Sequence, residues 1–368
     1  MSNSLLLERE ARITQALALE KPDRVPVVAL YTSFAARVTK TPLSEFVKSS
    51  FTAARVMIEA ADMIGGFDGI DYGSFFPSAL SLLWLSKVKL PGVELPADAG
   101  WQVHEQELMK QEDYERIINE GWPNWLGQYL TERISPTILQ DVMADAQDTP
   151  EIFDLWNAKG IPVLGGVMAT IPFEILCGAR SFAKFVRDLY KMPDKVEAAM
   201  AAMMPFMTKQ ALETTKQIGK KYMWVGGWRA AGSMLSQPLW DRFVFPYMEK
   251  VINEVIEAGV TPILHFDSDW GRDLARFKVL PKGKCIFAPD GMTDIYKAKE
   301  ILGDTMCIMG DVPPSMLSLG TPDEVYKYSR KLIEELGPTG FILHSGCDIP
   351  IDAKLENVQA MVAAATGK

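Results

Sequence analysis

The sequence predicts a closed (β/α)8 (TIM) barrel, the α/β fold in which eight parallel strands alternate with helices. Eight short apolar runs of strand type are spread along the 368 residues, and stretches with helical spacing lie between many of them. Strands that alternate with helices form a parallel sheet, and eight repeats close that sheet into a barrel. Polar side chains also collect where these runs end, at the edge where such barrels build their active sites.

The predicted strands are mostly apolar runs that end in a polar or turn residue. They cover residues 24–31, 67–72, 162–168, 222–227, 261–267, 284–290, 306–311 and 340–347. Helical spacing of apolar residues covers residues 238–258, 294–302, 322–336 and 355–365. The segment of about residues 75–158, after the second strand, is too long for one crossover. We expect it to add helices and an irregular cap to a single barrel domain that spans residues 1–368.

Composition and charge predict a soluble, cytoplasmic protein. Hydrophobic residues make up 48% of the chain and charged residues 23%, and the net charge of −9 argues against nucleic acid as a partner. The N-terminal run MSNSLLLEREAR carries charge too early for a signal peptide, and no uncharged stretch is long enough to span a membrane. Four dispersed cysteines fit a reducing compartment better than a disulfide framework.

Metal-binding residue types stand at two of the predicted strand ends. His265 and Asp267 end the run TPILHFDSDW, and Cys347 ends the run GFILHSGCDIP. Imidazole, carboxylate and thiolate bind zinc at neutral pH, and three protein ligands with an open position are typical of a catalytic zinc. A His-x-Asp pair alone is more often a hydrogen-bonded surface pair, so the third ligand on another strand end carries this prediction.

Three further ionisable residues are candidates for catalysis. Asp71 ends the second strand, Glu174 lies just beyond the third, and His344 precedes the cysteine of the last. Glu174 is interpreted either as a base or outer metal ligand, or as a capping carboxylate. His344 is interpreted either as a substrate-facing group or as a packed histidine. Cys307 lies within an apolar run, which favours a small buried hydrophobe over a further metal ligand.

Tryptophans near two strand ends indicate an aromatic wall. Trp224, Trp228 and Trp270 lie at or just beyond the ends of the fourth and fifth strands. A mouth lined by tryptophan suits a flat apolar group such as an aryl methyl ether. We expect Trp228 and Trp270 to face the incoming cofactor of a partner protein.

Several segments resemble the uroporphyrinogen decarboxylase superfamily. The similar stretches include EKPDRVPV, GVMATIPFEILCGARSFAKFVRDLY, SQPLWDRFVFPYMEKVINEVIEAG and GFILHSGCDIPIDAKLENVQAMV. The resemblance runs nearly end to end and implies the barrel fold. It also implies one of two chemistries, porphyrinogen decarboxylation or zinc-dependent methyl transfer to and from corrinoid proteins.

The residues favour the methyltransferase branch of that superfamily. The arginine-rich N-terminal motif expected of the decarboxylases is replaced by VVALYTSFAARVTK, and their Gly-His near the last strand is Gly346-Cys347 here. The methyltransferases are expected to bind zinc through His-x-Cys and a second Cys. This chain has His265-x-Asp267 and Cys347, and the exchange of a thiolate for a carboxylate favours a metal that accepts oxygen.

The resemblance therefore implies an enzyme that moves a methyl group from a small donor, such as an aryl methyl ether, to Co(I). No corrinoid-binding sequence of the type Asp-x-His-x-x-Gly occurs, so the corrinoid is expected to arrive on a separate protein. Three alternatives stay open: transfer from methylcobamide to a thiol, a metal-free decarboxylase that uses Asp71 and arginines, and a non-catalytic binding barrel. The oligomeric state is not predicted.

Overall fold

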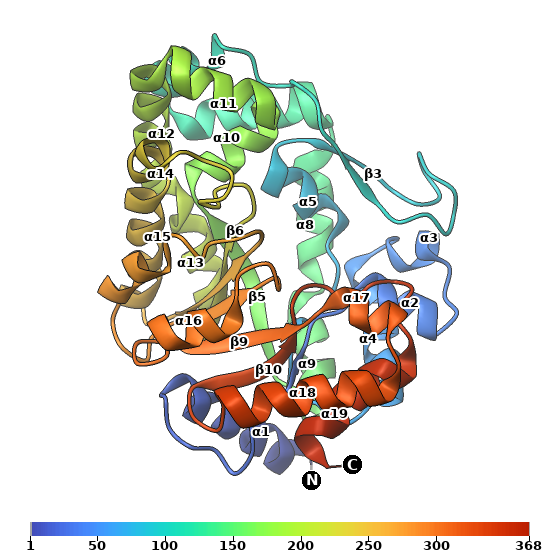
Figure 1. The fold of residues 1–368 in the computed structure, drawn as a ribbon. Coiled ribbons are helices and arrows are strands. Elements are labelled where there is room, and N and C mark those ends of the chain that lie inside the picture. Colours follow the sequence, from blue (N-terminus) through green and yellow to red (C-terminus); the bar gives the residue numbers. More distant parts are fainter. Residues whose placement is uncertain (1, 368) are drawn as a thin grey trace.

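Eight parallel strands form the barrel in the computed structural model, which describes residues 2–367 (Figure 1). In hydrogen-bonded order the strands are β1 (Val28–Ala29), β2 (Gly69–Tyr72), β5 (Val163–Thr170), β6 (Tyr222–Gly227), β7 (Thr261–Phe266), β8 (Ile286–Pro289), β9 (Cys307–Val312) and β10 (Phe341–Ser345). Parallel bridges from Val27 to Leu343 and from Tyr31 to Ile349 join the last strand to the first. The predicted fold class is confirmed.

Each of the eight predicted runs coincides with one barrel strand, although β5 and β9 extend one or two residues beyond their runs. The largest difference is at the first run, residues 24–31, where only Val28–Ala29 form a strand. This run contains Pro26, which has no N–H to donate to a neighbouring strand. The Pro26 carbonyl instead accepts a hydrogen bond of 2.9 Å from the Leu343 N–H, just before the strand begins.

Helices flank the barrel and agree with the apolar spacing in the sequence. The predicted helix at residues 322–336 is α18 (Pro322–Leu336), which begins with a capping box formed by Thr321 and Glu324. The predicted helix at residues 238–258 is instead two helices, α14 (Gln237–Phe243) and α15 (Phe245–Glu257). Pro246 explains the break, because its ring clashes with the carbonyl four residues earlier.

The remaining helices around the barrel follow β1 and the strands from β5 to β10. They are α2 (Ser33–Val38), α3 (Leu43–Phe46), α4 (Ser50–Ile64), α10 (Pro172–Arg180), α11 (Phe182–Lys191), α12 (Pro193–Met207), α13 (Lys209–Gln217), η2 (Leu274–Val279), α16 (Ile295–Leu302), α17 (Pro314–Leu319) and α19 (Leu355–Thr366).

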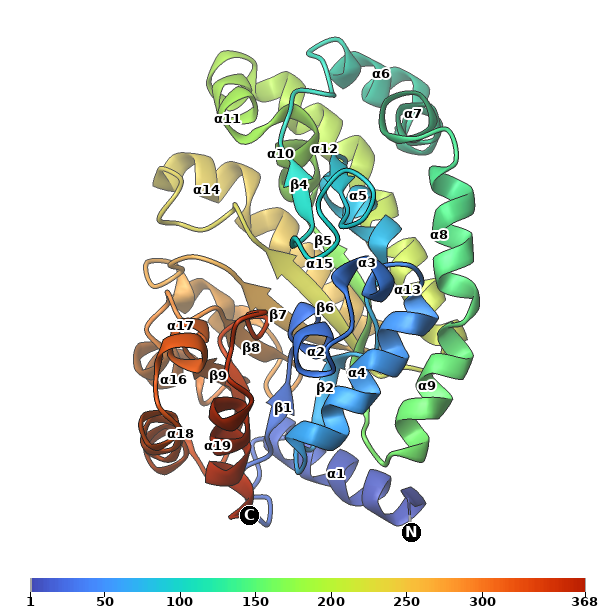
Figure 2. The same ribbon diagram turned by 90° about the vertical axis from the view of Figure 1, so that its right-hand side faces the viewer.

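The predicted insertion lies between β2 and β5. It contains α5 (Pro77–Trp84), α6 (Asp113–Glu120), α7 (Trp122–Tyr129), η1 (Leu130–Ile134), α8 (Ile138–Gln147) and α9 (Thr149–Ala158). It also contains an antiparallel pair, β3 (Lys87–Lys89) and β4 (Gln102–His104), which the sequence pattern did not predict. Figure 2 shows α8 and α9 along one side of the molecule, with α6 and α7 above them and α1 (Ser2–Leu17) below.

Apolar side chains fill the barrel interior and leave one end for the site. The interior cluster includes Val28, Leu164, Ile263 and Ile342, and Ile13 and Ala16 of α1 pack into the same cluster. The helix α1 therefore covers the end at which the strands begin. Polar side chains gather at the opposite end, where the strands finish.

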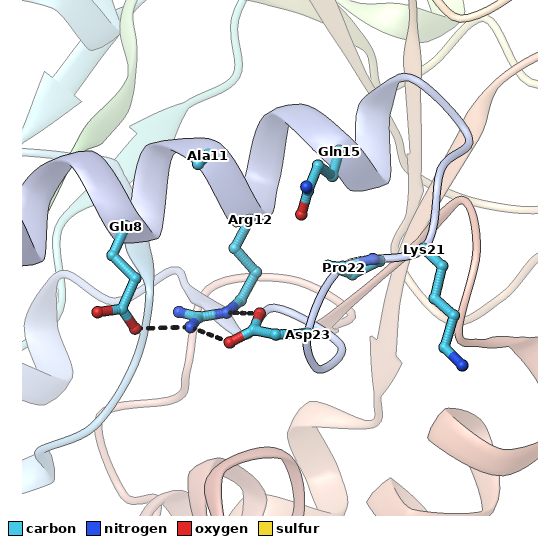
Figure 3. A pocket seen from close by; sticks show the side chains of 7 residues that line it. All are labelled: Glu8, Ala11, Arg12, Gln15, Lys21, Pro22 and Asp23. Carbon is cyan, nitrogen blue, oxygen red and sulfur yellow. Dashed lines mark hydrogen bonds and ion pairs between the residues drawn. The ribbon is translucent and has the colours of Figure 1, made fainter.

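A surface pocket of about 420 Å³ lies beside α1, at the covered end. Figure 3 shows that its arginine, Arg12, is held by Glu8 and Asp23, and Arg12 also bonds to buried Asp68 at 2.6 Å. These groups are already paired with one another, which is typical of a network that fastens α1 to the barrel. Within residues 2–367, no helix is both long enough and apolar enough to cross a membrane.

Candidate metal centre

The strand β7 places His265 inside the barrel. Ile263 belongs to the interior cluster, and His265 lies two residues further on, so its side chain points to the same side of the strand. The imidazole is buried and stacks on the Trp224 ring, with 4.4 Å between the ring centroids. Packing against Trp224 therefore fixes the orientation of the imidazole.

Turns after β7 and β10 bring Asp267 and Cys347 to the same point. The Asp267 N–H donates to the Gly227 carbonyl at 2.9 Å, which ties the end of β7 to β6. Cys347 follows Gly346, where a Cβ would lie only 2.6 Å from the Asp290 carbonyl oxygen, so the close approach requires glycine. One ligand atom from each of His265, Asp267 and Cys347 lies within 4.8 Å of the other two.

The geometry of this triad suits a shared metal ion. His265 Nε2 and Asp267 Oδ1 are 3.2 Å apart, yet Asp267 Oδ1 is buried without a properly directed hydrogen bond. Two ligand atoms that lie this close without forming a hydrogen bond to each other can both point at one metal ion between them. The separation is close to the roughly 3.4 Å expected between two ligands of a tetrahedral zinc with bonds of about 2.1 Å. One nitrogen, one oxygen and one sulfur ligand also form an acceptable zinc set.

The environment of His265 is strongly acidic. Burial lowers the pKa of His265, but Asp267 and Cys347 outweigh this effect and raise the pKa to about 10. The metal-free imidazole therefore carries a proton at neutral pH. A metal ion must displace that proton, because only the neutral imidazole is a ligand.

Asp71 and His344 form a second buried pair beside the triad. Asp71 lies on β2 and His344 on β10, and Asp71 Oδ2 is 3.2 Å from His344 Nε2. The other atom of each group, Asp71 Oδ1 and His344 Nδ1, is buried without a partner. The structure thus joins two of the three residues predicted for catalysis and leaves one polar atom of each available.

Tyr72, Trp224 and Asp348 complete the polar surroundings. The sequence pattern named Trp224 among the tryptophans at the strand ends, but it did not single out Tyr72 or Asp348. The Tyr72 and Trp224 ring centroids are 4.6 Å apart. Burial raises the pKa of Tyr72 well above its ordinary value, and the Asp71 and Cys347 charges add to the rise. Burial also raises the pKa of Asp348 to about 7, although Asp348 accepts a hydrogen bond from the Thr32 hydroxyl. The sequence offered one signal for these two residues, namely their neighbours: Asp348 directly follows Cys347, and Tyr72 directly follows Asp71.

Glu174 holds the loop after β6. Its fully buried carboxylate accepts hydrogen bonds of 2.7 to 3.0 Å from the backbone N–H groups of Trp228, Arg229 and Ala230. Burial raises its pKa to about 7 in spite of these bonds. The structure does not bring Glu174 into the triad, and the capping interpretation agrees with its contacts.

The two predicted tryptophans lie in different surroundings. Trp228 is half-buried and packs on Trp84, with 4.9 Å between centroids. Trp270 has no exposed surface, because it stacks on Phe266 and donates a hydrogen bond of 2.8 Å to the Asp267 carbonyl. The expectation that Trp270 faces a partner therefore does not agree with its position, which instead supports the backbone of a triad residue.

Cys307 is buried in the barrel interior. It belongs to the interior apolar cluster, and it lies outside the group of potential ligands found among the described residues. Its surroundings agree with the small buried hydrophobe favoured by the sequence.

Residues 142–367 match the family model for uroporphyrinogen decarboxylase (URO-D). The chain belongs to this family. It is 26% identical over 332 residues to the uroporphyrinogen decarboxylases of Geobacter metallireducens and Geobacter sulfurreducens, which covers 88% of this chain and 87% of each relative. A methyltransferase from Methanosarcina mazei has the same fold, with a TM-score of 0.73 at 17% sequence identity over 97% of both chains. The predicted superfamily is confirmed.

Proposed function

We propose that this member of the uroporphyrinogen decarboxylase family is a zinc-dependent methyltransferase. It moves a methyl group from a small O-methyl compound, such as an aryl methyl ether, to the Co(I) centre of a separate corrinoid protein. The observation that carries the proposal is the meeting of His265, Asp267 and Cys347 at the open end of the barrel. Three ligands of different types with room for a fourth are typical of catalytic zinc.

The chain's own residues divide the work of this reaction. His265, Asp267 and Cys347 would hold the metal, and zinc bound there supplies a Lewis acid that makes the ether oxygen a better leaving group. Loss of the methyl group leaves a negative oxygen on the donor, which must receive a proton. The Asp71 and His344 pair can hold that proton, because His344 Nδ1 and Asp71 Oδ1 are free of other partners.

The walls of the site orient the donor and exclude water. The Tyr72 and Trp224 rings lie next to the triad, since Trp224 stacks on His265. Glu174 supports the rim of the site indirectly, because its carboxylate fixes the backbone of the loop that carries Trp228. We assign Trp228 to the rim that meets the corrinoid protein, and Trp270 to support of the Asp267 backbone.

The names of the Geobacter relatives favour a second candidate, porphyrinogen decarboxylation. Asp71 is available for that chemistry, as expected from the resemblance. A porphyrinogen with eight carboxylates needs basic groups, however, whereas the residues here are acidic, namely Asp71, Asp267, Asp290 and Asp348. The acidic character of the site therefore supports methyl transfer over porphyrinogen decarboxylation.

A donor panel tests the proposal. Zinc-loaded protein is mixed with free Co(I) cobalamin and, in turn, methyl ethers, thioethers, amines and methanol. We expect methylcobalamin to form with an aryl methyl ether, together with one equivalent of the demethylated phenol. Methyl transfer from methylcobalamin to a thiol, without reaction of any ether, would support the reverse half-reaction instead. Decarboxylation of uroporphyrinogen by the metal-free protein would contradict the proposal.

A further inference from the structure

A second surface pocket, of about 240 Å³, lies between α11 and the residues just before α6. Figure 1 shows these two helices at the end of the molecule opposite α1. Drug-sized ligands occupy pockets of roughly 300 Å³ or more, so this pocket fits only a small ligand. It is distinct from the metal triad, none of whose residues lines it.

Basic side chains outnumber acidic ones around this pocket. The basic lining residues are Lys110, Arg180, Lys184 and Arg187, and the acidic ones are Glu107, Glu112 and Asp188. In the chain as a whole the balance is the reverse, with 38 lysines and arginines against 47 aspartates and glutamates. The pocket therefore attracts anions, although the protein is acidic overall.

Arg180 forms part of the inner wall of the pocket. Its side chain is almost fully buried, and it donates hydrogen bonds of 2.6 to 2.7 Å to Asp188, Glu107 and the Met109 carbonyl. Asp188 is fully buried and also accepts a hydrogen bond of 3.1 Å from the Tyr114 hydroxyl. These bonds fix the guanidinium in place, so the positive wall exists before any ligand binds.

One carboxylate, that of Glu107, serves three of these cations. Its oxygens lie 2.6 Å from Arg180 Nη1, 3.3 Å from Lys184 Nζ and 3.8 Å from Lys110 Nζ. The Arg180 hydrogen bond, with the two lysines, holds the pKa of Glu107 below its ordinary value. Within residues 2–367, neither lysine has another acidic partner. A further anion would therefore find both lysines only partly neutralised.

Arg187 has no counter-ion in the described part of the chain. Among residues 2–367, its side chain forms no ion pair and no hydrogen bond. Arg187 and Lys184 are three residues apart on α11, so they lie on the same face of the helix. A guanidinium presents its N–H groups in a fork that matches the oxygens of a phosphate. A ligand can thus bind Arg187 without breaking any bond in the protein.

We propose that this pocket is a binding site for a phosphate group, supplied by inorganic phosphate or by a small phosphate ester. The cations come from three elements, namely Arg180 at the end of α10, Lys184 and Arg187 on α11, and Lys110 before α6. A tetrahedral phosphate presents oxygens in several directions, whereas the two oxygens of a carboxylate lie in one plane. Donors on different sides therefore favour phosphate. The site goes beyond the proposed function and requires neither zinc nor a methyl donor.

Calorimetric titration of the full-length protein with inorganic phosphate tests the proposal. Ionic strength is held constant with chloride, because screening weakens any charged site. We expect one phosphate per chain, with a dissociation constant on the order of 1 mM. No saturable binding up to about ten times that concentration would overturn the proposal.

Phosphate also binds metal ions, so the titration is repeated after zinc has been removed. Binding should be unchanged, and it should persist even if the protein transfers no methyl group. Loss of binding on removal of zinc would place the phosphate at the triad and overturn the proposal.

Arg187→Gln is the sharpest variant, because it removes a cation that holds nothing else in the protein. It should weaken phosphate binding at least about tenfold, since a charged hydrogen bond is lost. The matched control is Lys191→Gln, which removes an exposed positive charge from the same helix outside the pocket. Unchanged binding in Arg187→Gln, or an equal loss in Lys191→Gln, would contradict a site in this pocket.

Glu107→Gln should change binding in the opposite direction. The glutamine keeps an oxygen for the Arg180 bond but removes the charge that occupies Lys184 and Lys110. Phosphate should therefore bind about fivefold more tightly. The control is Glu132→Gln, which removes an exposed charge from η1 outside the pocket and should leave binding unchanged. An equal gain in both variants, or no gain in Glu107→Gln, would contradict the proposal.

Two further ligands identify the anion. Acetate should bind at least about tenfold more weakly than phosphate, because it offers fewer oxygens to the surrounding donors. Equal binding of acetate would overturn the preference for phosphate. Glycerol 3-phosphate distinguishes the two sources of the group: tighter binding than inorganic phosphate would assign the pocket to an ester, and weaker binding would assign it to the free ion.

Discussion

Asp267 is the residue at which the site departs most from the resemblance, which implies a thiolate at this position. A carboxylate is a harder ligand than a thiolate, so it leaves the metal a better acceptor for oxygen. The departure therefore matches a donor in which the methyl group is attached to oxygen. His265 and Cys347 keep the expected types, and the structure places all three in one group.

The first prediction concerns this carboxylate. In Asp267→Cys, the zinc content should stay close to that of the wild type, because thiolates bind zinc well. Turnover of an aryl methyl ether should fall about tenfold, since the metal becomes softer. Zinc content is measured by elemental analysis and turnover by release of the phenol. Unchanged or faster turnover would show that the carboxylate does not tune the metal for oxygen.

Asp311 gives a prediction on pH-dependent stability. It is the last residue but one of β9, a buried carboxyl that accepts a hydrogen bond of 3.1 Å from the Tyr328 hydroxyl, and burial raises its pKa from 3.8 to about 6. The folded state thus binds more protons than the unfolded state between these two pH values. Stability contributed by the protonated carboxyl is therefore lost as the pH rises through about 6.

Asp311→Asn removes this dependence while keeping an acceptor for Tyr328. Relative to the wild type, the variant should gain up to about 3 kcal/mol of unfolding free energy between pH 4 and pH 7, at about 1.4 kcal/mol per pKa unit. Urea unfolding at several pH values measures the difference. A constant difference across this range would mean that the carboxyl has an ordinary pKa in the folded protein.

At the level of elements, the strands were the most predictable part of the fold. Strands buried on both faces are continuous apolar runs, so each of the eight runs could be recognised. The pair β3 and β4 was missed because it is short and only partly buried, with Lys87, Lys89, Gln102 and His104 in place of an apolar run. The break between α14 and α15 follows from Pro246, which a helical periodicity alone does not reveal.

The candidate site was predictable only in part. Residue type and place at a strand end identified the triad, because neighbouring strand ends meet at one edge of a barrel. Contacts made in three dimensions decided the rest. Trp270 stands just beyond a strand but turns into the outer core, and Tyr72 reaches Trp224 from a different strand. The directions in which the Trp270 and Tyr72 side chains point cannot be derived from the spacing of residues in the sequence.

The loop after β6 is predicted to depend on Glu174. Glu174→Ala leaves three backbone N–H groups without their acceptor, so the unfolding free energy should fall by about 2 kcal/mol or more. Glu174→Gln keeps an acceptor and should lose less. As a control, Glu105→Ala removes an exposed contact with Arg229 and one exposed hydrogen bond from the Phe182 N–H, and should cost about 1 kcal/mol or less. Equal stability of Glu174→Ala and Glu105→Ala would contradict the capping role.

At the scale of the whole molecule, α1 covers one end of the barrel and the triad lies at the other. In the proposed reaction, a cobalt centre approaches the donor from the end of the barrel opposite α1, in line with the bond from carbon to oxygen. The proposed corrinoid protein would therefore contact the rim around this end. Trp228 is the predicted rim residue that keeps part of its surface exposed.

Trp228→Glu tests this arrangement. A charge on the rim should slow methyl transfer to a protein-bound corrinoid about tenfold, because it disturbs a small, transient interface. Transfer to free Co(I) cobalamin at high concentration should change little. The ratio of the two rates is the measurement. Equal loss with both acceptors would place Trp228 in the donor pocket, and no loss with either would place it away from the rim.

The most direct test of the metal-centred function is a zinc titration of the stripped, full-length protein. Demethylation of an aryl methyl ether and methylation of Co(I) cobalamin are followed together as zinc is added. We predict that both rise in parallel and saturate at about one zinc per chain, as expected for a single three-ligand site. Cys347→Ala and His265→Ala should neither retain zinc after dialysis nor respond to it, whereas Cys307→Ala, altered in the barrel interior, should do both. Full methyl transfer by the stripped protein, or wild-type zinc occupancy in Cys347→Ala and His265→Ala, would contradict the assignment.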